Sequence, residues 1–114
     1  MKLMKEKTVS PARRSSRLTL AVPVVVWGMQ EKDASTFFEE TQTVSVAVHG
    51  ALVKLSAPVH PNQKVVVYNK QTQEEMGCRV VHVRNNGNGS NEVGIFFENP
   101  TPNFWKISFP PQVA

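Results

Sequence analysis

The chain has very little cysteine, with Cys78 alone among 114 residues. No intrachain disulfide is possible, so nothing in the sequence argues for an oxidising compartment. Long apolar runs are also missing, because no stretch reaches the roughly 18 apolar residues that a membrane-spanning helix needs. We therefore expect a single small cytoplasmic domain without a membrane span.

The alternative to a cytoplasmic location is export, directed by a secretory or twin-arginine signal. Arg13-Arg14 precede an apolar run, Leu18–Val26, that is long enough for such a signal. However, no small-x-small cleavage site follows the run, and its residues are β-branched rather than leucine-rich. The run is more typical of a strand than of an export signal.

Signatures of catalysis and of metal binding are missing as well. The three histidines, His49, His60 and His82, show no i, i+4 pair and have no accompanying carboxylate cluster. A zinc site needs three or four convergent ligands, which this spacing does not indicate. We expect no metal and no cofactor, and we interpret the histidines as turn, loop and strand residues.

Nucleophile and phosphate-cradle motifs are equally absent. The sequence has no Gly-x-Ser-x-Gly elbow, and the glycine-rich loop Asn85–Asn91 joins two expected strands without a Gly-Lys-Ser/Thr signature. The carboxylate pairs Glu39-Glu40 and Glu74-Glu75 are sequence neighbours, which point to opposite faces of a strand. Cys78 is expected to be a buried, inert thiol. We therefore expect a binding domain and not an enzyme.

Positive charge is present, but it is concentrated at one end of the chain. Residues 1–17 carry six basic side chains against one acidic, whereas residues 18–114 carry seven basic against eight acidic. A general nucleic-acid binder spreads a basic face over its fold. A basic arm on a nearly neutral body suits a compact anion better, and nucleic acid is not the expected partner.

Valine-rich segments separated by turn residues predict an all-β domain. The end of the second segment alternates, with Val44, Val46 and Val48 on one face and Thr43, Ser45 and Ala47 on the other. The expected strands are Leu18–Gln30, with Pro23 at an edge or bulge, Thr36–Val48, Ala51–Ser56, Lys64–Asn69, Met76–Arg84 and Glu92–Glu98. Six short antiparallel strands describe a small barrel or sandwich, followed by a short helical turn or packing plug at Phe104–Ile107.

An arginine-rich segment lies directly before the first expected strand, where residues 13–17 read Arg-Arg-Ser-Ser-Arg. Two arginines spaced i, i+4 in an extended arm can contact one ligand from two sides. The guanidinium fork pairs bidentately with phosphate and with the O6/N7 edge of guanine, which a lysine cannot do. Arg13 and Arg17 are thus candidate ligand contacts, while Arg14 either assists or is solvated.

In this arrangement the chain resembles the PilZ domain family, receptors for the bacterial second messenger cyclic di-GMP. The resemblance covers roughly residues 13–109 and depends on the order and spacing of several pieces. These are Arg13-x-x-x-Arg17, Leu18–Val26, Gly77–Val83, Glu92–Phe97 and Phe104-Trp105. It implies a six-stranded antiparallel Greek-key (split) barrel over residues 13–110, with a short C-terminal helical turn. Residues 1–12 have no apolar period and include Pro11, so we expect a flexible basic arm there, and we expect a tail at 111–114 after Pro110-Pro111.

The second motif of this family, Asp/Asn-x-Ser-x-x-Gly, is degenerate here. In the ungapped register it falls on Ser45–Gly50, so that Ser45 replaces the acid or amide, Ala47 replaces the serine, and Gly50 alone fits. The other register uses Thr43-x-Ser45, with extra chain before Gly50 accommodated by a β-bulge. We favour the ungapped register, but both lack the acidic or amide group.

The resemblance implies a ligand site formed by Arg13, Arg14, Arg17, Ser45, Ala47, His49 and Gly50. Two functional hypotheses follow. In the first, cyclic di-GMP folds the arm onto the Ser45–Gly50 strand end and changes the surface offered to an unidentified protein partner. In the second, the degenerate motif marks a PilZ-like protein-interaction module that does not bind the dinucleotide.

Overall fold

A computed structural model describes residues 17–29, 35–87, 89–99, 101 and 103–107 of the chain. The predicted arm (1–12) and tail (111–114), together with Arg13 and Arg14, lie outside the described residues. No helix in the described part is long and apolar enough to cross a bilayer.

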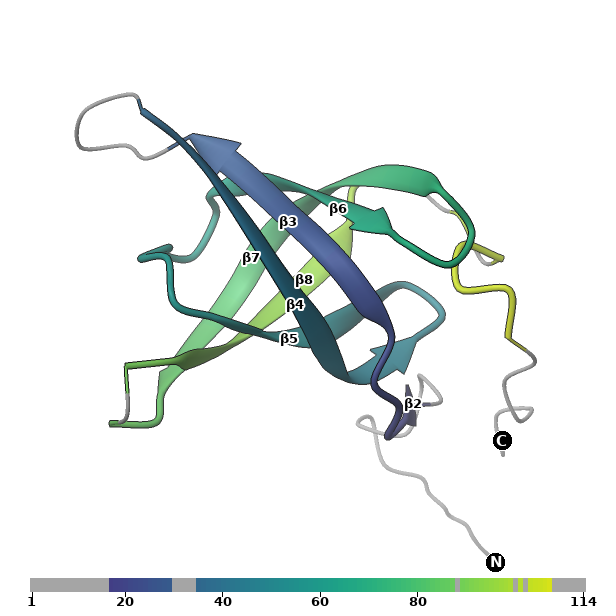
Figure 1. Cartoon of the computed structure of the whole chain (residues 1–114), viewed down its shortest axis with the longest axis horizontal. Helices are drawn as coiled ribbons and strands as arrows, with labels where there is room; N and C mark the ends of the chain where they lie inside the picture. Colours follow the sequence, from purple (N-terminus) through teal and green to yellow (C-terminus); the bar gives the residue numbers. More distant parts are fainter. Residues whose placement is uncertain (1–16, 30–34, 88, 100, 102, 108–114) are drawn as a thin grey trace, which may run out of the picture.

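The described residues form one antiparallel sheet that closes into a barrel (Figure 1). Its strands are β2 (Arg17–Leu18), β3 (Pro23–Met29), β4 (Thr36–Ala47), β5 (Gly50–Leu55), β6 (Lys64–Asn69), β7 (Glu74–Asn85) and β8 (Asn91–Phe97). Around the barrel the order is β4-β3-β6-β7-β8-β5, and a further β4–β5 pairing closes the ring. The predicted six-stranded antiparallel barrel is therefore confirmed, with the short β2 added on the edge of β4.

The connection between β5 and β6 gives the barrel its Greek-key topology. β3, β4 and β5 follow one another as antiparallel neighbours, and β6 then returns to pair with β3. The linking segment, residues 56–63, therefore passes from one side of the barrel to the other. This is the spatial order in which a fourth strand lies beside the first.

The first predicted strand, Leu18–Gln30, is wrong as a single strand. The structure divides it into β2 and β3, and Pro23 is the first residue of β3, where a missing N–H is tolerated. Between the two strands, the buried hydroxyl of Thr43 accepts a 2.8 Å hydrogen bond from the Val22 N–H and donates to the Leu20 carbonyl. The first strand is interrupted because the proline cannot extend the ladder and the Thr43 side chain holds the segment before it.

Valine side chains fill the interior of the barrel. Alternate residues of each strand point inward, so that one face of every long strand is buried. The fully buried side chains include Val24, Val26, Val46, Val53, Leu55, Val67, Cys78, Val80, Val93 and Phe104. This stiff, β-branched core is what the valine runs in the sequence predicted.

Phe104 and Trp105 close the barrel as an aromatic plug. Their rings pack edge-on with centroids 4.9 Å apart, and both contact the ring of Phe97 on β8. The predicted helical turn is not found here, and the described residues contain no helix. Instead, the Phe104 N–H donates to the Thr101 carbonyl and the Lys106 N–H donates to the Asn103 carbonyl. Lys106 has a left-handed backbone (φ 56°) that a continuing helix could not include.

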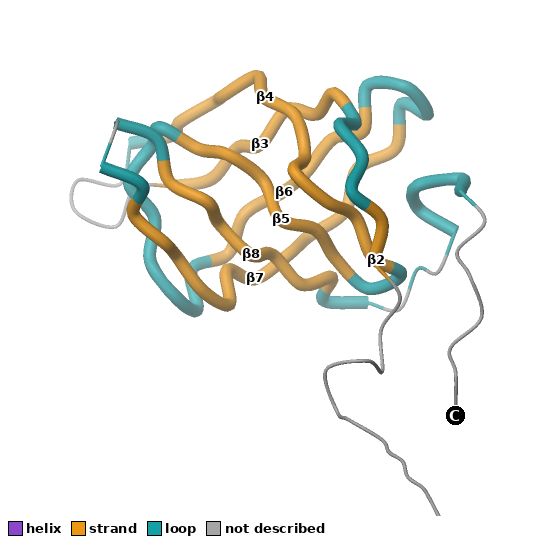
Figure 2. The backbone as a smooth tube through the Cα atoms, turned by 90° about the horizontal axis from the view of Figure 1, so that it is seen from below, coloured by secondary structure: helices purple, strands orange, loops and turns teal. Residues whose placement is uncertain are grey.

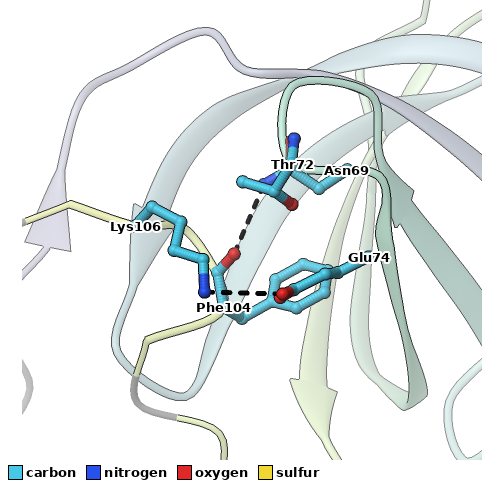
Figure 3. Close-up of polar contacts among 5 residues, drawn as sticks. All are labelled: Asn69, Thr72, Glu74, Phe104 and Lys106. Atoms are coloured by element: carbon cyan, nitrogen blue, oxygen red, sulfur yellow. Dashed lines mark hydrogen bonds and ion pairs between the residues drawn. The ribbon is translucent and has the colours of Figure 1, made fainter.

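Polar contacts attach this plug to the loop that follows β6 (Figure 3). The buried Asn69 amide donates to the Phe104 carbonyl at 3.4 Å, and its oxygen accepts from the Gln71 N–H at 2.9 Å. Lys106 Nζ lies 3.4 Å from a carboxylate oxygen of Glu74, with both side chains about half exposed. An exposed pair of this kind contributes little, so the buried aromatic rings and Asn69 fix the plug.

Candidate functional site

An open hollow of about 380 Å³ lies on the barrel surface where β2, β4, β5, β8 and β7 come together. Figure 2 shows β5, β8 and β7 side by side, and the pairing of β2 with the end of β4 brings Arg17 to the edge of this surface. The predicted residues that line the hollow are Arg17, Ser45, Ala47, His49 and Gly50. Segments about thirty residues apart in the sequence therefore meet at this hollow.

Arg17 reaches the hollow because β2 pairs with the last residues of β4. Leu18 lies opposite Val46 and packs against the core, so the neighbouring Arg17, opposite Ala47, projects outward. The Arg17 residue is exposed. Its guanidinium is thus available to an anion in the hollow.

A β-bulge determines which side chains of β4 face the hollow. The register with β5 shifts between Thr43 and Ser45, so that Thr43 lies opposite the core residue Val53 while Ser45 lies opposite Leu52. The predicted alternation, with Thr43 and Ser45 on one face, is therefore wrong at Thr43, because the bulge inserts an extra residue. Thr43 and Ser45 are both buried, at 2% and 6% exposure. Thr43 is hydrogen-bonded to the Leu20–Val22 segment, whereas Ser45 borders the hollow.

The two-residue turn between β4 and β5 requires glycine at its end. Ala47 pairs with Gly50, and a Cβ atom added to Gly50 would lie 2.1 Å from the Ile95 carbonyl oxygen. Glycine is needed here for close backbone approach, since its φ is not positive. Trp105 Nε1 donates to the Ala47 and Gly50 carbonyls at 3.0 and 3.2 Å, which joins the plug to the turn.

The opposite wall of the hollow contains residues that the sequence analysis did not assign to the site. They come from β7 and β8 and comprise Val81, His82, Arg84, Glu92, Gly94, Ile95 and Phe96. His82 was interpreted only as a strand residue. Its place on this wall follows from a second register shift, between Val80 and His82, which the continuous Val80–Val83 run does not reveal.

The charges of the hollow favour an anion. Arg17 and Arg84 contribute two guanidinium groups, and Glu92 contributes one carboxylate, whose Oε1 lies 4.0 Å from Arg84 Nη1. His49 and Phe96 place two rings side by side, with centroids 6.1 Å apart. Flat aromatic rings beside guanidinium forks suit a ligand that combines phosphate with a planar base.

Among the described residues, no group of three or more His, Cys, Asp or Glu side chains is close enough to hold a metal ion. Cys78 is buried in the core, and this burial, with the charge of Glu98, raises the pKa of its thiol to about 12. The hollow can hold a ligand by ionic, hydrogen-bonding and stacking contacts.

The sequence model of the PilZ domain matches residues 11–106, most of the chain. The chain belongs to the PilZ domain family. The predicted family is thus confirmed, and the matched range includes the hollow together with Arg13 and Arg14, whose positions the structure does not describe. PilZ domains are binding and signalling modules.

Comparison of structures gives the same fold. The chain is similar to a solved structure described as Bacillus subtilis Inhibitor of motility (MotI/DgrA), with a TM-score of 0.61 and 12% sequence identity. The match covers 83% of this chain and 46% of that one, so this chain spans less than half the length of its structural neighbour. No curated protein matches the chain in sequence.

Proposed function

We propose that this PilZ domain is a receptor for cyclic di-GMP, which it binds in the hollow between β2 and the β4–β5 turn. The observation that carries the proposal is the pairing of Arg17 with Ala47. It brings the described arginine of the Arg-x-x-x-Arg motif beside the strand end that bears Ser45 and Gly50.

The size and chemistry of the hollow support a nucleotide ligand. Its volume of about 380 Å³ falls within the range of about 300–1,000 Å³ that is typical of small-molecule sites. The ligand carries two phosphates and two guanines, and a guanidinium can pair bidentately with either group. Arg13 and Arg17 would act together on it, and Arg14 either assists or is solvated.

The degenerate strand motif lowers the affinity that we expect. A serine hydroxyl at position 45 cannot reproduce the bidentate contact of an Asp or Asn with guanine, at a cost of about 1–3 kcal/mol. Ala47 lacks the hydroxyl of the family serine, which costs about 0.5–1.5 kcal/mol more. Binding weaker than that of a complete motif, by roughly 10- to 1000-fold, is therefore part of the proposal.

Folding of the arm would convert binding into a signal. In the described part of the chain, β2 pairs with β4 through two residue pairs, so few backbone contacts hold Arg17 in place. Ordering each further residue costs about 1 kcal/mol or more of backbone entropy, which ligand contacts would have to offset. The bound and free states would then present different surfaces to a protein partner.

Isothermal titration calorimetry with cyclic di-GMP tests the proposal. The wild-type domain should bind, and Arg13→Ala and Arg17→Ala should each abolish measurable binding. Arg79→Ala is a matched control, because Arg79 is exposed on β7 but does not line the hollow. Absence of heat from the wild-type domain at high ligand concentration would refute the proposal.

A second candidate function is a protein-interaction module that needs no dinucleotide. The observation in its favour is the replacement of both polar motif positions, by Ser45 and Ala47. Such a module would capture the same partner with and without cyclic di-GMP, and Arg17→Ala would leave that capture unchanged. Dependence of capture on both the dinucleotide and Arg17 would exclude it.

A further inference from the structure

The β7–β8 wall of the hollow is built by a local distortion of β7. Val80 is fully buried and Val83 packs against the core, yet the residues between them, Val81 and His82, are both exposed. The register shift between Val80 and His82 produces this arrangement. Bulges re-aim side chains, and this one directs His82 and, two residues later, Arg84 to the outer face.

Gly94 provides the seat for the His82 ring. A Cβ atom at Gly94 would lie 2.7 Å from Nδ1 of His82 and 3.2 Å from its Cε1. The imidazole therefore lies directly over the backbone of Gly94, and any side chain at that position would displace it.

Arg84 adds a largely exposed guanidinium to the same wall. Its side chain is 70% exposed, and its Nη1 lies 4.0 Å from an oxygen of Glu92, whose side chain is only 21% exposed. The less exposed carboxylate can orient the guanidinium while most of the fork's donors still face solvent. Arg84 thus offers the same bidentate chemistry as Arg17 at the other side of the hollow.

The width of the hollow separates these two arginine-bearing walls. Arg17 lies on β2, and the paired strands β4, β5 and β8 lie between β2 and β7. Four inter-strand spacings of about 4.8 Å give roughly 19 Å along the sheet between the two walls. A mononucleotide held at Arg17 by its phosphate would scarcely reach the second wall, whereas a dinucleotide would extend across both.

We propose that His82 and Arg84 form a second recognition edge, which contacts the half of the cyclic dinucleotide remote from Arg17. This inference rests on the proposed function and adds a basis for selectivity. Arg84 binds a guanine O6/N7 edge or the second phosphate. The His82 ring, which lies over Gly94, stacks on the guanine base. These contacts partly replace those lost at Ser45 and Ala47.

Calorimetry on His82→Ala and Arg84→Ala tests this second edge, with cyclic di-GMP and GMP as the two probes. Both residues are exposed, so the variants should fold, and Arg79→Ala on the same strand is the control. We expect each variant to lose about 10- to 100-fold in affinity for cyclic di-GMP and to change little toward GMP.

The outcomes separate the inference from the function on which it rests. Wild-type binding of cyclic di-GMP with unchanged affinity in both variants would overturn the second edge and leave the proposed function intact. An equal loss toward cyclic di-GMP and GMP would also overturn it, because the wall would then attract any anion. No binding by the wild-type domain would overturn both proposals.

Discussion

Gly50 illustrates how a single residue can serve the fold and the site together. Its missing side chain lets β5 approach the Ile95 carbonyl, and its own carbonyl accepts a hydrogen bond from Trp105. The sequence motif identified Gly50 as part of the site. Only the structure shows why glycine is needed there: the position has no space for a side chain, and its backbone is not left-handed.

Gly50→Ala should therefore destabilise the domain. The added Cβ would meet backbone, which cannot move aside as a side-chain tip can, and overpacking of this kind costs about 1–3 kcal/mol or more. Urea denaturation followed by circular dichroism measures the loss. Gly77→Ala is the matched control, because its Cβ would meet only a Glu98 side-chain oxygen at 3.4 Å. Equal stability of the two variants would contradict the explanation.

Cys78 makes stability depend on pH at the alkaline end. Burial, with the charge of Glu98, raises the thiol pKa from 9.0 to about 12 in the folded chain, so the unfolded chain ionises first. The stabilisation is full below pH 9 and is lost as the pH rises from 9 toward 12. The free energy of unfolding, measured by urea denaturation, should decline between pH 7 and 11. In Cys78→Ala this free energy should decline less steeply with pH. Identical slopes in the two proteins would exclude Cys78 as its source.

At the scale of elements, Thr43 connects the fold to the arm. The β4 bulge turns its hydroxyl inward, where it binds both Leu20 and Val22, and this contact sets the course of the chain from β2 to β3. Neither feature is visible in the sequence, because Thr43 occupies an ordinary position in an alternating strand. Bulges add a residue without changing composition, so pattern analysis missed this one and the one at Val81.

Thr43→Val keeps the shape of the side chain but removes its hydrogen bonds. The Val22 N–H would lose its partner in a buried setting, at a cost of about 1–3 kcal/mol. We also expect weaker binding of cyclic di-GMP, because the segment that carries Arg17 would be less restrained. Thermal denaturation and calorimetry measure the two effects, with Thr36→Val, an exposed position of β4, as the control. Unchanged stability would contradict the role given to Thr43.

At the scale of the whole molecule, much of the fold was predictable from the sequence. β6 was predicted with its observed bounds, and β4, β5, β7 and β8 within one or two residues, because valine runs separated by turn residues mark strands clearly. The closed barrel and its family followed from the order of the motifs. The division of the first strand and the turns of the plug could not be predicted, because both depend on contacts with residues far away in the sequence.

The sequence marked only one side of the hollow. Arg17 and the Ser45–Gly50 strand end carry a motif, whereas His82, Arg84 and Phe96 reach the hollow through strand pairing and a bulge. Side chains from β7 and β8 have no local signal that relates them to the arm. Their contribution could be recognised only when the order of strands around the barrel was known.

Mapping of the binding site by NMR tests the central claim most directly. Titration of the isotope-labelled domain with cyclic di-GMP should shift the backbone amide signals of residues 45–52 and 92–96, together with those of Arg17 and His82. Signals from the opposite side of the barrel, such as Trp27 and Phe38 on β3 and β4, should stay in place. Shifts confined to that opposite side, or no shifts at saturating ligand, would contradict the account.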